Sequence, residues 1–268
     1  MRAWIRLGLA AVVIVAAIIG VRLVGGNAIL LEDVQAERAE DETAVVTMNI
    51  RNSGEPDRLI SARSDDAEVS VVSSDADHLP IPAETTIGLT TEGAFLVLKD
   101  IRGSVEDGRL FPITLIFENA GEVQTKARFG KAMTDHGGMK HDVGTDDTDA
   151  ADAMAMMEMD YVVPEGEPAP TLSISATPRE GGGFTVWIET MNFAFSKEAA
   201  DGPHEAGVGH GHLYVGGVKL GRVYGNSAEV PRLPAGKQIV RVRLNTNNHQ
   251  TYVVDDEAVT ATATVSEE

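Results

Sequence analysis

The sequence predicts an all-β protein of two antiparallel β-sandwich domains, joined by an acidic His/Met-bearing linker and preceded by an N-terminal membrane segment. Three observations favour this architecture: apolar and polar residues alternate over short stretches, turn-forming residues separate those stretches, and one long acidic segment interrupts the pattern. The first half shows no sustained i, i+3, i+4 apolar spacing of the kind that amphipathic helices require. We therefore divide the 268 residues into four parts: 1–26, 27–131, 132–170 and 171–268.

The first part has the pattern of an export signal. Arg2 and Arg6 precede an apolar run from Leu7 to Val21, and such a basic start keeps the N-terminus in the cytoplasm. The run is short for a membrane span, but Arg22 can snorkel and so extend it. We expect an uncleaved signal anchor in preference to a cleaved signal peptide. Either one places the body of the chain in the periplasm or on the outer face of the cytoplasmic membrane.

Short strands and turns fill the second part from residue 44 onward. Apolar residues recur at every second position in AVVTMNI, FLVL and FPITLIFE, the spacing that places them on one face of a strand. RNSGEPDR, PIPAE, TTEG and ENAGE supply the turn chemistry between them. The alternation returns at Thr171, in TLSIS, FTVWI, HLYV and IVRVRL. This return predicts a second sandwich, of immunoglobulin-like type.

The third part, 132–170, breaks the alternation. It is strongly acidic and ends in PEGEPAP, so it can bury too little apolar surface to fold alone and is expected to be a linker. Near its start, the stretch MTDHGGMKHD gathers two His and two Met within ten residues: Met133, His136, Met139 and His141. Thioether sulfur beside imidazole suits a soft metal ion such as copper. The alternative is a solvated, low-complexity segment without ligands.

Composition excludes several classes of function. The formal net charge of −19 argues against nucleic-acid binding, because no basic surplus exists to displace counterions from phosphates. The absence of cysteine excludes disulfides, thiolate metal sites and cysteine nucleophiles, so a metal must be held by His, Met, carboxylate or backbone oxygen. No catalytic constellation is evident, and GVGHGH lacks the strand–turn–helix context of a dinucleotide fingerprint. We therefore do not expect an enzyme.

Most of the second part resembles the PCu(A)C family of periplasmic copper(I) chaperones. The resemblance lies in AVVTMNIRNSGEPDRLISARSDDA, LPIPAETTIGL, FLVLKDI and GRLFPITLIFENAGEV, which together cover most of residues 44–130. It implies a cupredoxin-like sandwich and a role connected with copper.

The copper ligands of that family have no counterpart in this sequence. Family members hold copper with two His and two Met, the last pair as H-x-M on a strand, and this motif falls on FLV. Phe95 and Val97 thus stand where the resemblance implies His and Met, and Val72 stands near the position of the other His. His78 is the remaining candidate nearby, and we expect it to be a surface loop residue. The resemblance therefore implies the frame of a copper chaperone without its metal site.

The fourth part carries a His-x-His motif. His210 and His212 in GVGHGHLYV project to the same side of a strand together with Tyr214. His249 follows the strand Val240–Leu244, and if the end of that strand neighbours His212, three imidazoles surround one site suited to Cu(II) or Zn(II). The alternative is that the first two histidines are polar residues on a solvated sheet face and that the third hydrogen-bonds its turn.

Other residues of this part are weaker candidates. His204, on the loop before the motif, is a fourth possible ligand, whereas Arg241 and Arg243 alternate on a strand and are expected on a solvated face. The stretch GHGHLYVGGVKLGRVYG also resembles a domain of copper-related exported proteins, from which we carry over no ligands.

Taken together, these features favour an exported protein that binds copper, as Cu(I) or Cu(II), and buffers or delivers it. The expected ligands are the His and Met residues of the linker and the C-terminal His cluster. The expected partners are the copper ion and a copper-receiving envelope protein, with membrane contact through the N-terminal segment only. The alternative is a metal-free envelope module that keeps the chaperone fold and binds another protein.

Overall fold

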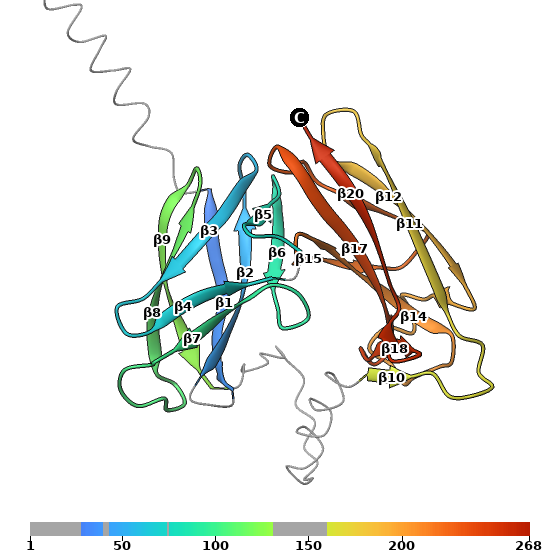
Figure 1. Ribbon diagram of the computed structural model, residues 1–268, viewed down its shortest axis with the longest axis horizontal. Helices are drawn as coiled ribbons and strands as arrows, with labels where there is room; N and C mark the ends of the chain where they lie inside the picture. Colours follow the sequence, from blue (N-terminus) through green and yellow to red (C-terminus); the bar gives the residue numbers. More distant parts are fainter. Residues whose placement is uncertain (1–27, 40–42, 74, 131–159) are drawn as a thin grey trace, which may run out of the picture.

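The computed structural model describes residues 28–39, 43–73, 75–130 and 160–268, and all regular structure in these ranges is β-strand (Figure 1). Within them, no helix is long and apolar enough to cross a membrane. The predicted all-β class is therefore confirmed. The N-terminal segment and the linker residues proposed as ligands lie outside the described ranges.

In the residues that the structure describes, the N-terminal sandwich has nine strands. They are β1 (Ile29–Arg38), β2 (Ala44–Asn52), β3 (Asp57–Arg63), β4 (Glu68–Val72), β5 (Leu79–Ile81), β6 (Thr85–Leu89), β7 (Phe95–Lys99), β8 (Leu110–Phe117) and β9 (Gly121–Phe129). In one layer β2 pairs with β1, β6 and β7, and β7 continues to β4. The other layer runs β9–β8–β3–β5, and a short parallel pairing of β1 with β9 links the two.

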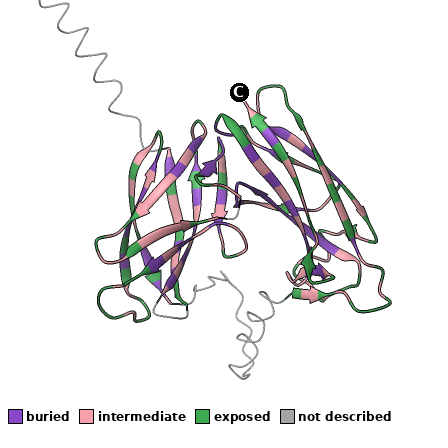
Figure 2. Ribbon diagram, viewed as in Figure 1, coloured by how far each residue is buried: buried purple, intermediate pink, exposed green. Residues whose placement is uncertain are grey.

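The core of the N-terminal sandwich follows the alternation read from the sequence. Along β2 the side chains of Ala44, Val46, Met48 and Ile50 are buried, and the residues between them are partly exposed (Figure 2). β7 and β8 show the same two-residue period. As expected, burial of every second side chain marks strands that have one face on the core.

The C-terminal sandwich is formed by the remaining strands. They are β10 (Asp160–Val162), β11 (Thr171–Pro178), β12 (Phe184–Met191), β13 (Ala194–Phe195), β14 (Val208–Val215), β15 (Val218–Val223), β16 (Ser227–Val230), β17 (Gly236–Thr246), β18 (Thr251–Val254), β19 (Glu257–Ala258) and β20 (Thr260–Glu267). One layer is β11–β12–β16, and the other is β15–β14–β17–β20. Short parallel pairings add β13 to β14 and β10 to β18, so one strand lies inside the segment expected to be linker.

The two sandwiches lie side by side and share an interface (Figure 1). β15 pairs with β6 at Lys219 and Gly88, so strands of the two sandwiches are hydrogen-bonded neighbours. The side chain of Val218, also on β15, is fully buried and belongs to the hydrophobic core of the N-terminal sandwich. The hairpin of β14 and β15 is thus held by both cores.

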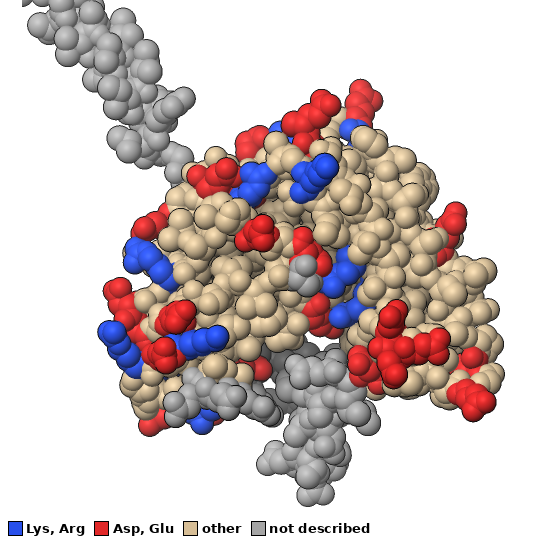
Figure 3. Space-filling view, in the orientation of Figure 1, with Lys and Arg blue, Asp and Glu red and all other residues tan. Residues whose placement is uncertain are grey.

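This interface covers a polar sheet face that the sequence analysis expected to be solvated. Arg241 forms an ion pair with Asp75 at 3.3 Å, and Arg243 forms one with Glu92 at 3.0 Å. The two arginine side chains are only 17% and 13% exposed. The expectation of a solvated face was wrong, because acidic residues of the N-terminal sandwich lie against it. In Figure 3, basic and acidic side chains lie next to one another where the two sandwiches meet.

Candidate metal centre

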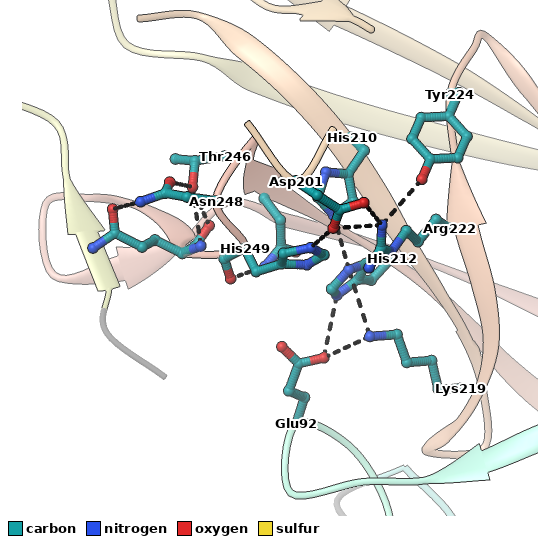
Figure 4. A network of polar contacts seen from close by, with 12 residues as sticks. Glu92, Asp201, His210, His212, Lys219, Arg222, Tyr224, Thr246, Asn248 and His249 are labelled. Carbon is teal, nitrogen blue, oxygen red and sulfur yellow. Dashed lines mark hydrogen bonds and ion pairs between the residues drawn. The ribbon is translucent and has the colours of Figure 1, made fainter. Parts of the chain in front are cut away.

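Strand pairing brings the three predicted histidines together. His210 and His212 lie on β14, whose residues 209–215 pair with β17 in antiparallel register, so His210 is opposite Asn245 at the end of β17. His249 follows in the turn between β17 and β18, with a backbone φ of 70°. The turn therefore folds the third imidazole back over the strand that carries the other two (Figure 4).

The spacing of the ring nitrogens suits a single metal ion. One nitrogen from each of His210, His212 and His249 lies within 4.8 Å of the others. The Nε2 atoms of His210 and His212 are 3.1 Å apart. Two nitrogens that each bind one ion at ~2.0 Å are separated by roughly 2.8–3.4 Å, depending on the angle between the bonds. The pair on β14 thus already has the separation that a shared ion requires.

Burial keeps the two β14 histidines neutral. Residues His210 and His212 are 0% and 1% exposed, so they do not lie on a solvated sheet face. Burial, reinforced by the nearby His212 and His249, lowers the pKa of His210 to about 3. Burial also lowers the pKa of His212 to about 4, and the hydrogen bond to Glu92 offsets only part of that effect. At neutral pH both imidazoles are in the form that binds metals.

Two carboxylates hold the rings from outside the cluster. Nδ1 of His212 lies 3.2 Å from a carboxylate oxygen of Glu92, and Nε2 of His249 lies 2.5 Å from one of Asp201. Hydrogen bonds from His249 and then from Arg222 lower the pKa of Asp201 to about 2, so this carboxyl group is ionised and can only accept. Carboxylates in this position commonly orient histidine ligands and raise their basicity.

One cation also approaches the cluster. The ammonium Nζ of Lys219 lies 2.9 Å from a Glu92 oxygen and 3.4 Å from Nε2 of His212. Burial lowers the pKa of Lys219, although Glu92 opposes the shift. A metal at Nε2 of His212 would take the lone pair that this ammonium faces, and Lys219 would keep Glu92 as its partner.

The lowered histidine pKa values predict an acid-sensitive fold for the metal-free protein. Unfolded histidines titrate near pH ~6.5. In the folded protein, the pKa values of His210 and His212 are about 3 and about 4. Between these limits the unfolded chain binds more protons, so the free energy of unfolding is highest above the unfolded pKa and falls as the pH drops below it.

Urea titrations from pH ~7 to ~5 measure this slope. The variant His210→Gln/His212→Gln should show a flatter pH dependence than the wild type. An identical pH dependence of the free energy of unfolding in the two proteins would contradict the lowered pKa values of His210 and His212.

The remaining predicted residues lie elsewhere. The His204 ring packs against the Tyr161 ring at a tilt of 41°, with centroids 4.1 Å apart, and is not part of the three-histidine cluster. Val72 pairs with Phe95 across β4 and β7, so the position implied by the family resemblance is filled by apolar side chains. His78 is exposed, as expected of a surface loop residue.

Sequence reasoning missed the two carboxylates that contact the histidines. Glu92 belongs to the turn TTEG, and Asp201 belongs to a loop, so no periodicity marks either residue. Their roles depend on contacts across 120 residues, between Glu92 and His212, and across 48 residues, between Asp201 and His249. In a chain with 41 acidic residues, composition offers no signal that selects these two.

Comparison with known proteins bears on the N-terminal sandwich. Residues 29–129 match the model of the family described as "Putative lipoprotein LpqE-like". This match covers β1 to β9 and stops before the three histidines, which all lie in the C-terminal sandwich. No curated protein matches the chain.

Solved PCuAC domains match the same region. The copper-bound PCuAC domain from PmoF2 is 28% identical, with a TM-score of 0.35, and the match covers 38% of this chain and 92% of that domain. The apo PCuAC domain from PmoF1 is 24% identical, with a TM-score of 0.36, and the match covers 39% and 95% of the two chains. The CupB2 chaperone from Pseudomonas aeruginosa matches 89% of this chain at 11% identity, with a TM-score of 0.25. The predicted resemblance to PCu(A)C domains is confirmed for the LpqE-like region.

Proposed function

We propose that this chain is an exported copper-binding protein that buffers or delivers copper, and that His210, His212 and His249 hold the ion. The observation that carries the proposal is the convergence of one nitrogen from each histidine within 4.8 Å. Two of the three imidazoles are buried and neutral, and carboxylates orient two of them. Buried, carboxylate-oriented imidazoles are typical of metal ligands.

Copper is the favoured ion for two reasons. Divalent copper binds a given nitrogen site more tightly than the other first-row divalent metals do. In addition, a PCuAC domain that is 28% identical to the N-terminal sandwich is described as copper-bound. The lipoprotein description of the matched family supports a place in the cell envelope. Because this chain has no cysteine to carry a lipid, we propose that residues 1–26 attach it to the membrane.

The linker residues Met133, His136, Met139 and His141 complete the proposal as ligands for Cu(I). Their thioether groups suit the softer oxidation state, which the three-histidine cluster serves less well. The described structure resumes at Asp160, which pairs with Thr251, two residues beyond His249. The linker therefore rejoins the fold beside the proposed site, a position that supports transfer of copper between the two sets of ligands.

Titration of the metal-free chain tests this function. We expect one Cu(II) ion to bind with a dissociation constant below about 1 μM, a free energy of roughly −8 kcal/mol or stronger, and to bind more tightly than Zn(II). The electron paramagnetic resonance spectrum should show coupling to nitrogen. At a free copper concentration of about 100 times the dissociation constant, the free energy of unfolding should rise by ~2.7 kcal/mol, and a chelator should reverse the rise. Binding weaker than micromolar would rule out the proposal.

A second candidate is a metal-free scaffold that binds an envelope protein. One observation favours it: Glu92 of the N-terminal sandwich contacts the side chains of His212, Lys219 and Arg243 in the C-terminal sandwich. In that case the histidines serve only to join the two sandwiches. The copper titration separates the two candidates, because a scaffold gains no stability from micromolar copper.

A further inference from the structure

We propose that Glu92 positions His212 for metal binding, so that the copper affinity of the C-terminal sandwich depends on its contact with the N-terminal one. This inference rests on the proposed copper site and adds a residue to it from a different sandwich. Glu92 lies in the loop between β6 and β7, within the region 29–129 that matches the LpqE-like family. The three histidines lie on β14 and in the turn between β17 and β18.

The Glu92 carboxylate is held in place by several donors. One oxygen accepts from the Tyr214 hydroxyl at 3.0 Å. The same oxygen accepts from Lys219 Nζ at 2.9 Å and faces Nδ1 of His212 at 3.2 Å (Figure 4). The other oxygen meets an Arg243 nitrogen at 3.0 Å. A hydroxyl and two cationic side chains thus surround the carboxylate, and its oxygens act as acceptors toward them.

The Glu92 carboxylate, 3.2 Å from Nδ1, determines which nitrogen of His212 is left to bind a metal. A neutral imidazole carries one N–H, and the carboxylate places that hydrogen on Nδ1. Nε2 is left with a free lone pair, and this is the atom that lies 3.1 Å from Nε2 of His210. Without Glu92 the ring can place its hydrogen on Nε2 and can rotate, and both changes remove the ligand.

The backbone of the β6–β7 loop is fitted closely to the C-terminal sandwich. Gly93 follows Glu92, and a Cβ atom there would lie 2.2 Å from the carbonyl oxygen of Gly217. The next residue, Ala94, donates its backbone N–H to the same carbonyl at 2.7 Å. Only a glycine permits this approach. This backbone contact therefore fixes the loop against the C-terminal sandwich and holds Glu92 beside His212. A positioning residue needs such support from its surroundings.

Copper affinity of full-length variants tests the proposal. Glu92→Ala should weaken Cu(II) binding by roughly 10- to 100-fold, the usual effect of removing an outer partner of a metal-bound histidine. Glu92→Gln should weaken it less, because the amide oxygen still accepts from Nδ1 but carries no charge.

Asp75→Ala is the matched control. It breaks another ion pair of the same interface, Asp75–Arg241 at 3.3 Å, in which the aspartate side chain is 12% exposed. It should lower stability but leave copper affinity within about twofold of wild type. NMR of the His212 ring in the metal-free proteins should show the hydrogen on Nδ1 in the wild type and in Asp75→Ala, and a mixture of tautomers in Glu92→Ala.

The possible outcomes separate this inference from the copper site itself. If wild type binds copper and Glu92→Ala binds it equally well, the positioning role is overturned and the copper site stands. Equal weakening by Glu92→Ala and Asp75→Ala would assign the effect to the interface as a whole and would also overturn it. If wild type binds no copper, the site and its positioning residue fail together.

Discussion

A variant in which His210 and His212 are both alanine is expected to lose high-affinity copper binding. Structural zinc sites of four ligands bind with about 10–16 kcal/mol, or roughly 2.5–4 kcal/mol per ligand. Removing two of three imidazoles should therefore weaken Cu(II) binding by more than about a thousandfold. Isothermal titration calorimetry on the full chain, with a competing chelator for the wild type, measures the difference.

The matched control removes two other histidines. His78→Ala/His204→Ala lowers the histidine count equally, and neither residue belongs to the cluster. Its copper affinity should stay within about twofold of wild type. An equal loss in both variants would show that copper binds histidines nonspecifically, and an unaffected His210→Ala/His212→Ala variant would move the site elsewhere. If His210→Ala/His212→Ala keeps its copper affinity, and the affinity is lost on replacing Met133, His136, Met139 and His141, the site belongs to the linker.

Among the substitutions proposed for this protein, Val218→Asp is expected to reduce the free energy of unfolding the most. Val218 is fully buried in the core of the N-terminal sandwich although its strand, β15, belongs to the C-terminal one. An aspartate at this position has no cationic partner within that hydrophobic core. A buried carboxylate without a partner destabilises by about 3–5 kcal/mol, partly relieved if it becomes protonated. Urea unfolding monitored by circular dichroism measures the change.

Val218→Ala serves as the comparison for this substitution. It removes two methyl groups without adding charge, and the lost burial together with the cavity should reduce the free energy of unfolding by roughly 2 kcal/mol. The aspartate variant should also bind copper more weakly, because opening the interface withdraws Glu92 from His212. A loss of stability no greater than that of Val218→Ala would show that the N-terminal core does not need the hairpin of β14 and β15.

Much of the fold was predictable from residue order. The two-residue period in AVVTMNI becomes β2 with its alternate side chains in the core, and the polar turns become the connections. The same period placed His210 and His212 on one side of β14, because neighbouring side chains on a strand point to opposite faces. These features depend on backbone geometry over a few residues, and they can therefore be predicted from the spacing of residues in the sequence.

Long-range contacts determined what the polar side of β14 and β17 meets. Alternation shows that one face of a strand is polar, but a polar face against water and one against another sandwich have the same pattern. Glu92 of the N-terminal sandwich contacts His212 and Arg243, and Asp75 pairs with Arg241. His210 instead lies against His249 and Tyr224 of its own sandwich. The residue pattern alone thus specified two sandwiches and a pair of histidines. The turn after β17 added His249 to that pair, and the packing of one sandwich on the other placed the Glu92 carboxylate beside His212. Residue order could not decide either contact, because the free energy of a polar group depends on what surrounds it.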